Sequence, residues 1–266
     1  MFGSWYSDPT IYTNTFKNAV PYPHIVIENF LSDDIASELE ETFPPIDNTW
    51  YRYWNPIEKK YAKNTFDGLS AYQTLFETLQ TDDFVNKISQ ITGISGIEAD
   101  PYLHGAGIHY HPRGGKLDMH LDYSIHPKSG KERRINIILY LNRDWNVEYG
   151  GDLQLWNSEF TQCEARISPK FNSAVIFRTS DISYHGLPTP ITCPINKGRK
   201  SIAIYYVSDP RTDITPRYKA EFRPLPDQPV SKELALLYNI RRERIITEDI
   251  LKEVYPNWEE DGNGYW

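Results

Sequence analysis

The chain has 266 residues, of which 39% are hydrophobic and 24% are charged, and its formal net charge is −8. This composition is typical of a globular protein with enough apolar side chains for a sizeable core. The negative charge argues against a general nucleic-acid binder, because such a protein needs a basic face to meet phosphates. No run approaches the ~20 apolar residues of a membrane-spanning helix, so no membrane partner is predicted.

The cysteine content and the first residues bear on the compartment. Cys163 and Cys193 are the two cysteines of the chain, and their spacing is not that of a metal site. The first ten residues contain no basic segment followed by an apolar run, so no signal peptide is predicted. These features predict a cytoplasmic protein in a reducing compartment, with a single disulfide left open as an alternative.

The N-terminal part of the chain predicts one strand followed by helices. Residues 23–30 alternate around β-branched side chains, which favours a strand. Helices are predicted after the N-cap Ser32, near residues 71–80 and near residues 82–92. Residues 45–69 are rich in Pro, Asn and aromatic side chains and are predicted to be irregular.

Short β-branched and aromatic runs then alternate with turn residues. The runs are 107–111, 134–141, 152–156, 173–178 and 199–208. Short strands at such regular spacing predict a β-sandwich or barrel.

Two helical patterns follow, near residues 231–243 and 247–254. This tail is too short to form a well-packed domain alone, so we expect it to dock on the β core. The whole chain is therefore predicted to be one domain, mainly β with flanking helices. Its parts are N-terminal helical support at about 22–96, a β core at about 97–208 and a C-terminal helical extension at about 209–266.

The histidines are concentrated before the middle of the chain. Five of the seven lie in a stretch of twenty-three residues: His104, His109, His111, His120 and His126. His120 and Asp122 are two positions apart, so on a strand they would face the same side. His185, just after the run 173–178, is the candidate third ligand. Two histidines and one carboxylate form a facial triad that suits iron(II) and leaves positions open for chemistry. The other four histidines are interpreted as structural or solvated.

A cation at the start of the last strand-like run adds a second feature. Arg199 and Ser201 share one face of that strand, and a guanidinium inside an apolar barrel needs a carboxylate partner. A dicarboxylate that binds iron at one end and Arg199 at the other would satisfy both groups, and 2-oxoglutarate is such a molecule. Lys200 would replace Arg199 as the anchor if the strand register slipped by one residue.

Five segments carry a family resemblance. They are GGKLDMHLD (114–122), INIILYLNRDW (135–145), GGDLQLW (150–156), SYHGLP (183–188) and RKSIAIYY (199–206). In order and approximate spacing the chain resembles the iron(II)/2-oxoglutarate-dependent dioxygenases, in their prolyl-4-hydroxylase-like branch. The resemblance implies a double-stranded β-helix, or jelly-roll, core with the triad at its open end.

The resemblance also implies roles for individual residues. The implied iron ligands are His120, Asp122 and His185, and the implied 2-oxoglutarate contacts are Arg199, Tyr140, Tyr110, Ser201 and Leu153. Dioxygen would be the second co-substrate, and ascorbate is a candidate accessory cofactor. The implied reaction is hydroxylation of an unactivated C–H bond with release of succinate and CO2, and a prolyl residue is the candidate target. Leu117 stands where prolyl hydroxylases often carry tyrosine, and this departure concerns the substrate rather than the cofactors.

Two other classes of function stay open at this point, a non-catalytic jelly-roll binding module and a cupin-type metalloenzyme that does not use 2-oxoglutarate. The substrate is expected to be a small molecule or a peptide, and its charge can be argued from one loop. Between Arg113 and Arg134 there are six basic and three acidic residues on a chain of net charge −8. Such a positive rim predicts an anionic substrate. The sequence carries no prediction of the oligomeric state.

Overall fold

The computed structural model describes residues 1–256 and 258. The strands are β1 (His24–Glu28), β2 (Tyr51–Trp54), β3 (Glu58–Lys63), β4 (Glu98–Ala99), β5 (Gly107–Pro112), β6 (Lys116–Leu121), β7 (Glu132–Tyr140), β8 (Leu153–Trp156), β9 (Cys163–Ile167), β10 (Ser173–Arg178), β11 (His185–Leu187), β12 (Gly198–Ser208) and β13 (Glu221–Phe222). The α-helices are α1 (Thr13–Asn18), α2 (Asp33–Glu41), α3 (Ser70–Leu79), α4 (Asp82–Thr92), α5 (Lys232–Glu243) and α6 (Glu248–Val254). Three short 3₁₀ helices are η1 (Ser4–Tyr6), η2 (Pro9–Tyr12) and η3 (Val147–Tyr149).

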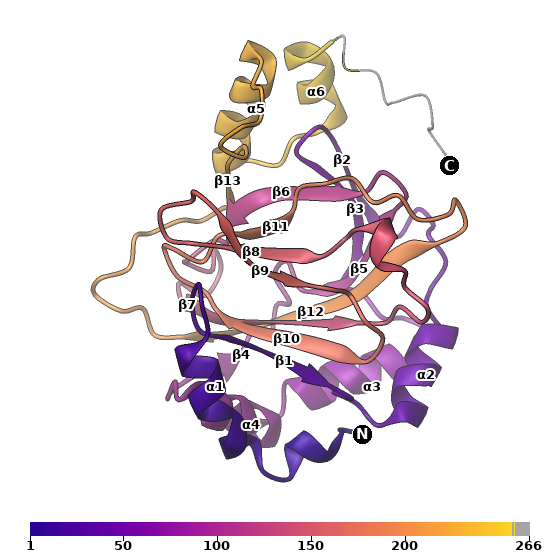
Figure 1. The fold of residues 1–266 in the computed structure, drawn as a ribbon, viewed down its shortest axis with the longest axis vertical. Coiled ribbons are helices and arrows are strands. Elements are labelled where there is room, and N and C mark those ends of the chain that lie inside the picture. Colours follow the sequence, from indigo (N-terminus) through magenta and orange to yellow (C-terminus); the bar gives the residue numbers. More distant parts are fainter. Residues whose placement is uncertain (257, 259–266) are drawn as a thin grey trace.

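The strands form one antiparallel sheet that curls into a nearly closed barrel. Neighbouring strands follow the order β1-β10-β7-β12-β5-β3-β6-β11-β8-β9. One layer holds β1, β10, β7, β12 and β5, the other holds β6, β11, β8 and β9, and β3 links the layers at one side (Figure 1). This arrangement is the predicted jelly roll.

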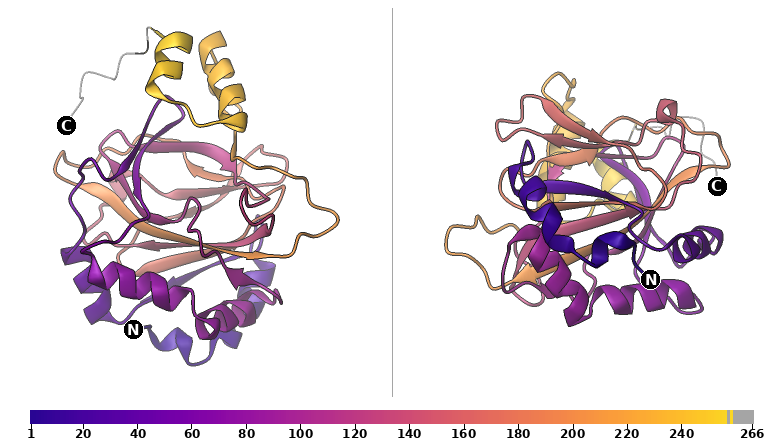
Figure 2. Two further views of the ribbon diagram at one scale, coloured as in Figure 1. Left: turned by 180° about the vertical axis from the view of Figure 1, so that it is seen from behind. Right: turned by 60° about the horizontal axis from the view of Figure 1, so that its bottom comes forward.

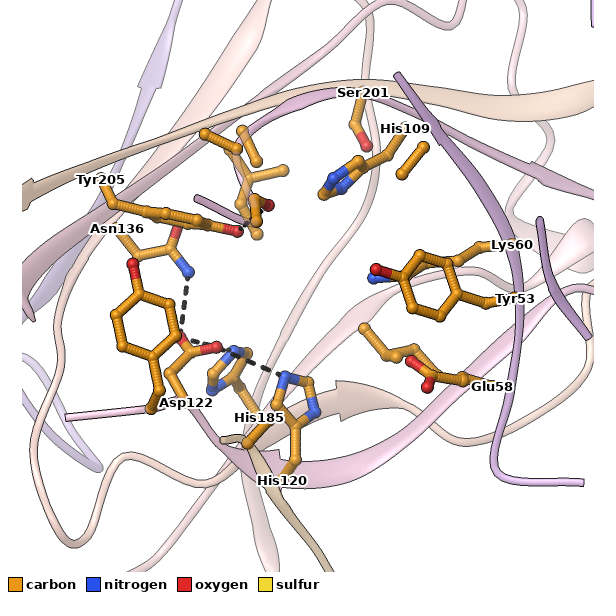
Figure 3. A pocket seen from close by; sticks show the side chains of 18 of the residues that line it. Tyr53, Glu58, Lys60, His109, His120, Asp122, Asn136, His185, Ser201 and Tyr205 are labelled. Atoms are coloured by element: carbon orange, nitrogen blue, oxygen red, sulfur yellow. Dashed lines mark hydrogen bonds and ion pairs between the residues drawn. The ribbon is translucent and has the colours of Figure 1, made fainter. Parts of the chain in front are cut away.

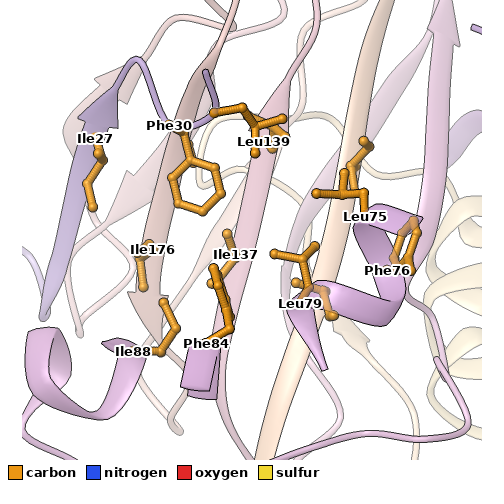
Figure 4. Close-up of a cluster of buried hydrophobic side chains, with 14 of the residues drawn as sticks. Ile27, Phe30, Leu75, Phe76, Leu79, Phe84, Ile88, Ile137, Leu139 and Ile176 are labelled. Atoms are coloured by element: carbon orange, nitrogen blue, oxygen red, sulfur yellow. The ribbon is translucent and has the colours of Figure 1, made fainter. Parts of the chain in front are cut away.

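Helices cover one layer of the barrel and the C-terminal helices sit at the opposite end of the molecule. Figure 2 shows α1 to α4 gathered beneath the layer that contains β10, β7 and β12. Leu75 and Leu79 of α3 and Phe84 of α4 pack there in one cluster with Ile137 and Leu139 of β7 (Figure 4). Thr81 caps α4 by accepting a hydrogen bond from the amide of Phe84. No helix in the described part of the chain is long and apolar enough to cross a membrane.

Alternation along the strands divides the two faces of this layer. On β7, Ile137 and Leu139 face the helices, whereas Asn136 and Ile138 line a cavity inside the barrel. The same period of two places Ile202 of β12 on the helix side, with its neighbours on the cavity side. The outer face is therefore a dry apolar core, and the inner face is left free for polar side chains.

The C-terminal extension docks on the β core, as expected. Strand β13 pairs with β6, and the Tyr238 hydroxyl on α5 donates to Asp118 Oδ2 at 2.6 Å. Arg241 Nε donates to Glu58 Oε1 at 2.7 Å, and both side chains are buried. These contacts hold α5 against the end of the barrel that lies furthest from α1 to α4.

The prediction of irregular structure over residues 45–69 is wrong in its centre. Residues 51–63 form a hairpin, in which β2 pairs with β3 and β3 continues the sheet between β5 and β6. The sequence EKKYAK of β3 lacks apolar alternation because the side of this strand that faces the barrel lines a polar cavity. The helix α1, near the N-terminus, was not predicted either.

Candidate metal centre

Three potential ligands meet at one end of the barrel. His120 lies near the end of β6, Asp122 follows that strand, and His185 opens β11 directly opposite His120 in the sheet. Their ligand atoms all lie within 4.8 Å of one another, and His185 Nε2 is 3.4 Å from Asp122 Oδ2. We call these three residues the metal triad. The structure thus brings together the three ligands expected from the sequence.

Both histidines are held in the tautomer that binds a metal through Nε2. Nδ1 of His120 lies 2.9 Å from the carbonyl oxygen of Asp118, and Nδ1 of His185 lies 2.9 Å from that of Ser183. A carbonyl only accepts, so each Nδ1 carries the proton and each Nε2 presents its lone pair to the site. Burial is the largest cause that lowers the pKa of both rings, which favours the neutral form that a metal needs.

The carboxylate of the triad is ionised and fixed in orientation. Burial alone would raise the pKa of Asp122, but Arg133 and the two histidines outweigh it and lower that pKa to about 2. Arg133 Nη2 lies 3.0 Å from Asp122 Oδ2, and Asn136 Nδ2 donates to the same oxygen at 3.3 Å. The Arg133 guanidinium is itself held 3.2 Å from the centre of the Tyr205 ring. Asp122 therefore faces the two histidines as a charged oxygen ligand.

The metal triad borders a cavity of about 360 Å³ inside the barrel. Figure 3 shows the triad on one wall and Tyr53, Glu58 and Lys60 of the β2–β3 hairpin on the opposite wall. Pockets for small ligands are of this size, with a few polar groups on an otherwise apolar lining.

Arg199 and His111, which line a second part of the cavity, and Tyr140 beside Arg199 have buried polar atoms without partners among the described residues. Arg199 is 2% exposed; its Nε donates to the Gly151 carbonyl at 2.8 Å, while its Nη2 has no hydrogen-bond partner among the described residues. The Tyr140 hydroxyl and both ring nitrogens of His111 are also buried, and they too have no hydrogen-bond partner among the described residues. His111 stands opposite Arg199 in the β5–β12 pairing, and the Arg199 guanidinium lies 4.8 Å from the Tyr140 ring centre. Buried donors without an acceptor are costly, so this group fits an anionic ligand.

Of the remaining candidate residues, two line the cavity and one does not. Ser201 and Leu153 line the cavity, and Ser201 lies 3.5 Å from Arg199 Nη1. Lys200 points to the other side of its strand, where its Nζ lies 5.2 Å from the ring centre of Phe43. The alternative anchor at Lys200 therefore does not reach the cavity.

The expectation that Tyr110 contacts the co-substrate is corrected by its position. Tyr110 lies on the outer face of β5 and packs against Phe43 at 6.0 Å between ring centres. A Cβ on Gly198 would lie 2.3 Å from the Tyr110 ring, so this outer face is tightly filled. The side chains that β5 directs inward are His109 and His111, which were interpreted as structural or solvated. The resemblance did not reveal whether Tyr110 or the adjacent His111 faces the barrel interior.

Comparison with known proteins agrees with this geometry. Residues 106–207 match the model of the 2OG-Fe(II) oxygenase superfamily. The chain is 29% identical over 178 residues to prolyl 3-hydroxylase OGFOD1 of Xenopus laevis, a match that covers 63% of this chain and 32% of the relative. The chain thus spans about a third of the length of this curated relative.

Solved structures show the same fold. A prolyl hydroxylase of Trichoplax adhaerens, in complex with a hypoxia inducible factor peptide fragment, has a TM-score of 0.53 at 17% identity, covering 77% of this chain and 94% of that one. A prolyl-4-hydroxylase of Pseudomonas putida has a TM-score of 0.53 at 15% identity, covering 76% and 99%. The metal triad lies within the residues that match the 2OG-Fe(II) oxygenase superfamily, and the chain has the fold of the prolyl hydroxylases.

Proposed function

We propose that the protein is an iron(II)- and 2-oxoglutarate-dependent dioxygenase that hydroxylates an unactivated C–H bond. The observation that carries this proposal is the presence, in one cavity, of a metal triad and a separate group of buried unpartnered donors. One site suits a divalent metal and the other suits the far carboxylate of a dicarboxylic acid. A binding module without catalysis has no need of both.

The residues present fit both groups. The two Nε2 atoms and the Asp122 carboxylate would hold iron(II), and Arg199, with Tyr140 and His111 beside it, would bind the distal carboxylate of 2-oxoglutarate. Bound together, iron and 2-oxoglutarate supply the oxidising chemistry by which one oxygen atom of O2 enters the substrate and the other enters succinate, with loss of CO2.

The protein side chains position these groups and keep water out. Arg133 and Asn136 hold the second oxygen of Asp122, so the carboxylate cannot rotate away from the histidines. Phe222 of β13 stacks on the His120 ring at 4.8 Å between centres, and Leu153 and Ile138 line the inner wall. A dry wall of this kind protects reactive species from side reactions.

We further propose a prolyl residue or a proline-like small molecule as the target. What supports this is the name of the OGFOD1 relative and the fold shared with prolyl hydroxylases, one of them solved with a peptide. A cytoplasmic location is part of the proposal, and the free thiols of Cys163 and Cys193 support it because a reducing compartment leaves cysteines unpaired.

The test is coupled turnover. The iron-loaded protein is supplied with 2-oxoglutarate, prolyl peptides and proline-like metabolites, and products are read by mass spectrometry for one added oxygen that accompanies succinate release. His185→Ala serves as the inactive control. Succinate release that is equal in the wild type and in His185→Ala would refute the proposed activity.

A further inference from the structure

Four of the six cations of the basic loop that suggested an anionic substrate form ion pairs within the protein. Lys116 Nζ lies 2.6 Å from Asp118, and Lys131 contacts Glu98. The other cations of that loop pair as follows: Arg133 with Asp122, Arg134 with Glu132, Arg113 with backbone carbonyls, and Lys128 with the face of Tyr102. This rim therefore gives little support to the charge argument.

The cavity itself, however, holds an excess of positive charge. Its described lining includes six cations, Lys60, Lys63, Arg133, Arg199, Lys219 and Arg241, and two carboxylates, Glu58 and Asp122. Arg241 and Arg133 are matched by Glu58 and Asp122, and a metal dication adds further positive charge beside the triad. Since 2-oxoglutarate brings only two negative charges, which face the metal and Arg199, the cavity stays positive when it is bound.

This balance leaves Lys60, Lys63 and Lys219 without a carboxylate partner among the described residues. Lys63 donates to Thr49 Oγ1 at 2.6 Å, whereas Lys60 faces the metal triad. It lies on the inward face of β3, across the cavity from the metal triad (Figure 3). Among the described residues, no carboxylate forms an ion pair with the Lys60 ammonium group, and its Nζ lies over the face of Tyr53, 5.0 Å from the ring centre. The nearest acid on the strand, Glu58, is engaged by Arg241 at 2.7 Å. A lysine confined to such a place loses hydration without gaining an ion pair.

We propose that Lys60 is a specificity residue that binds an anionic group, a carboxylate or a phosphate, on the substrate. This inference rests on the proposed function and deepens it by naming the substrate class. The hairpin places the ammonium on the wall opposite the metal, so the substrate lies between them with its target carbon toward the triad and its anion toward Lys60. A cavity of about 360 Å³ that also holds 2-oxoglutarate admits only a small acid or a single residue of a peptide with its acidic neighbour.

The first experiment measures anion binding without turnover. Equilibrium dialysis with labelled sulfate is performed on protein loaded with Mn(II) and saturating 2-oxoglutarate, so that the Arg199 site is filled. One sulfate per chain is expected in the wild type and in Lys60→Arg, and Lys60→Met should weaken its binding by about tenfold to a hundredfold. Lys59→Met is the matched control, because Lys59 is the next residue on β3 and its Nζ lies over the Trp54 ring at 5.8 Å rather than in the cavity.

A second experiment distinguishes the source of the anion. Prolyl peptides with aspartate or asparagine beside the proline, and free imino acids against their amides, are compared by turnover. The wild type should prefer the acid of each productive pair, and Lys60→Met should lose that preference while Lys59→Met keeps it. Preference within the peptide pair points to an acidic side chain, and preference within the free pair points to a small acid.

A third readout separates substrate recognition from a structural role. If Lys60 served the fold, Lys60→Met would lower the melting temperature of the unliganded protein. We expect it to rise, because the substitution removes a poorly hydrated charge. Equal sulfate binding in wild type and Lys60→Met, or none in the wild type, would overturn the assignment of Lys60. Failure of labelled 2-oxoglutarate to bind in the same dialysis would instead overturn the proposed function.

Discussion

Replacing Arg199 by alanine is expected to weaken 2-oxoglutarate binding by a large factor. Arg199 is 2% exposed, and its Nη2 has no hydrogen-bond partner among the described residues. Its guanidinium lies 4.8 Å from the Tyr140 ring centre, and it stands opposite His111 in the sheet. Without the guanidinium, the distal carboxylate of 2-oxoglutarate would be buried with neutral donors only. Breaking a buried ion pair in this way costs ~3–5 kcal/mol. At about 1.4 kcal/mol for each factor of ten, affinity falls by roughly a hundredfold to several thousandfold.

The assay is calorimetric titration of the Mn(II)-loaded protein with 2-oxoglutarate, which reports binding without turnover. Arg199→Lys should lose less than Arg199→Ala, since it keeps the charge but not the planar fork. Lys200→Ala is the matched control, because Lys200 is the adjacent cation on β12 and faces Phe43 on the other side of the strand. Circular dichroism of each variant checks that the barrel is intact.

The outcome that contradicts this reasoning is specific. If Arg199→Ala binds 2-oxoglutarate within threefold of the wild type, the unpartnered donors do not form the anchor. If Lys200→Ala loses binding while Arg199→Ala does not, the anchor is Lys200 rather than Arg199.

Three further predictions follow from the same geometry. His185→Ala should abolish iron binding and succinate release while far-UV circular dichroism stays unchanged, as measured by metal analysis and turnover. Burial first, and then Arg199, lower the pKa of His111 well below 6.5, so the unfolded chain takes up a proton before the folded one. Stability of the metal-free protein should therefore fall as pH drops below 6.5, and urea unfolding of His111→Phe should show a slope reduced by up to about 1.4 kcal/mol per pH unit. Arg241→Met leaves Glu58 buried without its partner and should lower the free energy of unfolding by ~3–5 kcal/mol, most of which the added substitution Glu58→Gln should restore in urea unfolding.

The sequence predicted the strands best where their outer face is apolar. Runs such as 134–141 and 199–208 were recognised because every second residue packs against helices, which leaves an alternating pattern. The helix α4 was equally clear, since its Thr81 cap and the terminal Gly93 at φ 68° are local signals. Features set by neighbours in the chain could thus be predicted.

Features that depend on the cavity could not be predicted from the sequence. The β2–β3 hairpin has no apolar alternation, because its inward side chains contact ligand space rather than core. Tyr110 and His111 are adjacent, and the choice between them depends on which face of β5 meets the barrel interior, a tertiary property. The sequence did contain one useful signal. His109 and His111 are two positions apart on a strand, so they face the same side, and two polar side chains on one face indicate that this face lines the cavity.

The barrel keeps its stability and its chemistry on opposite faces of the same strands. The outer face of β7 and β12 is sealed by α3 and α4, and this apolar layer provides the burial that a fold of this size requires (Figure 4). The inner face contains buried groups that cost free energy until ligands arrive, Arg199 and Lys60 among them. Such a cost is tolerated only because the outer layer offsets it. Substitutions that truncate the outer face should therefore unfold the protein without changing ligand preference. Neutral substitutions of Arg199 or Lys60, which form no ion pair among the described residues, should change ligand preference with stability unchanged or raised.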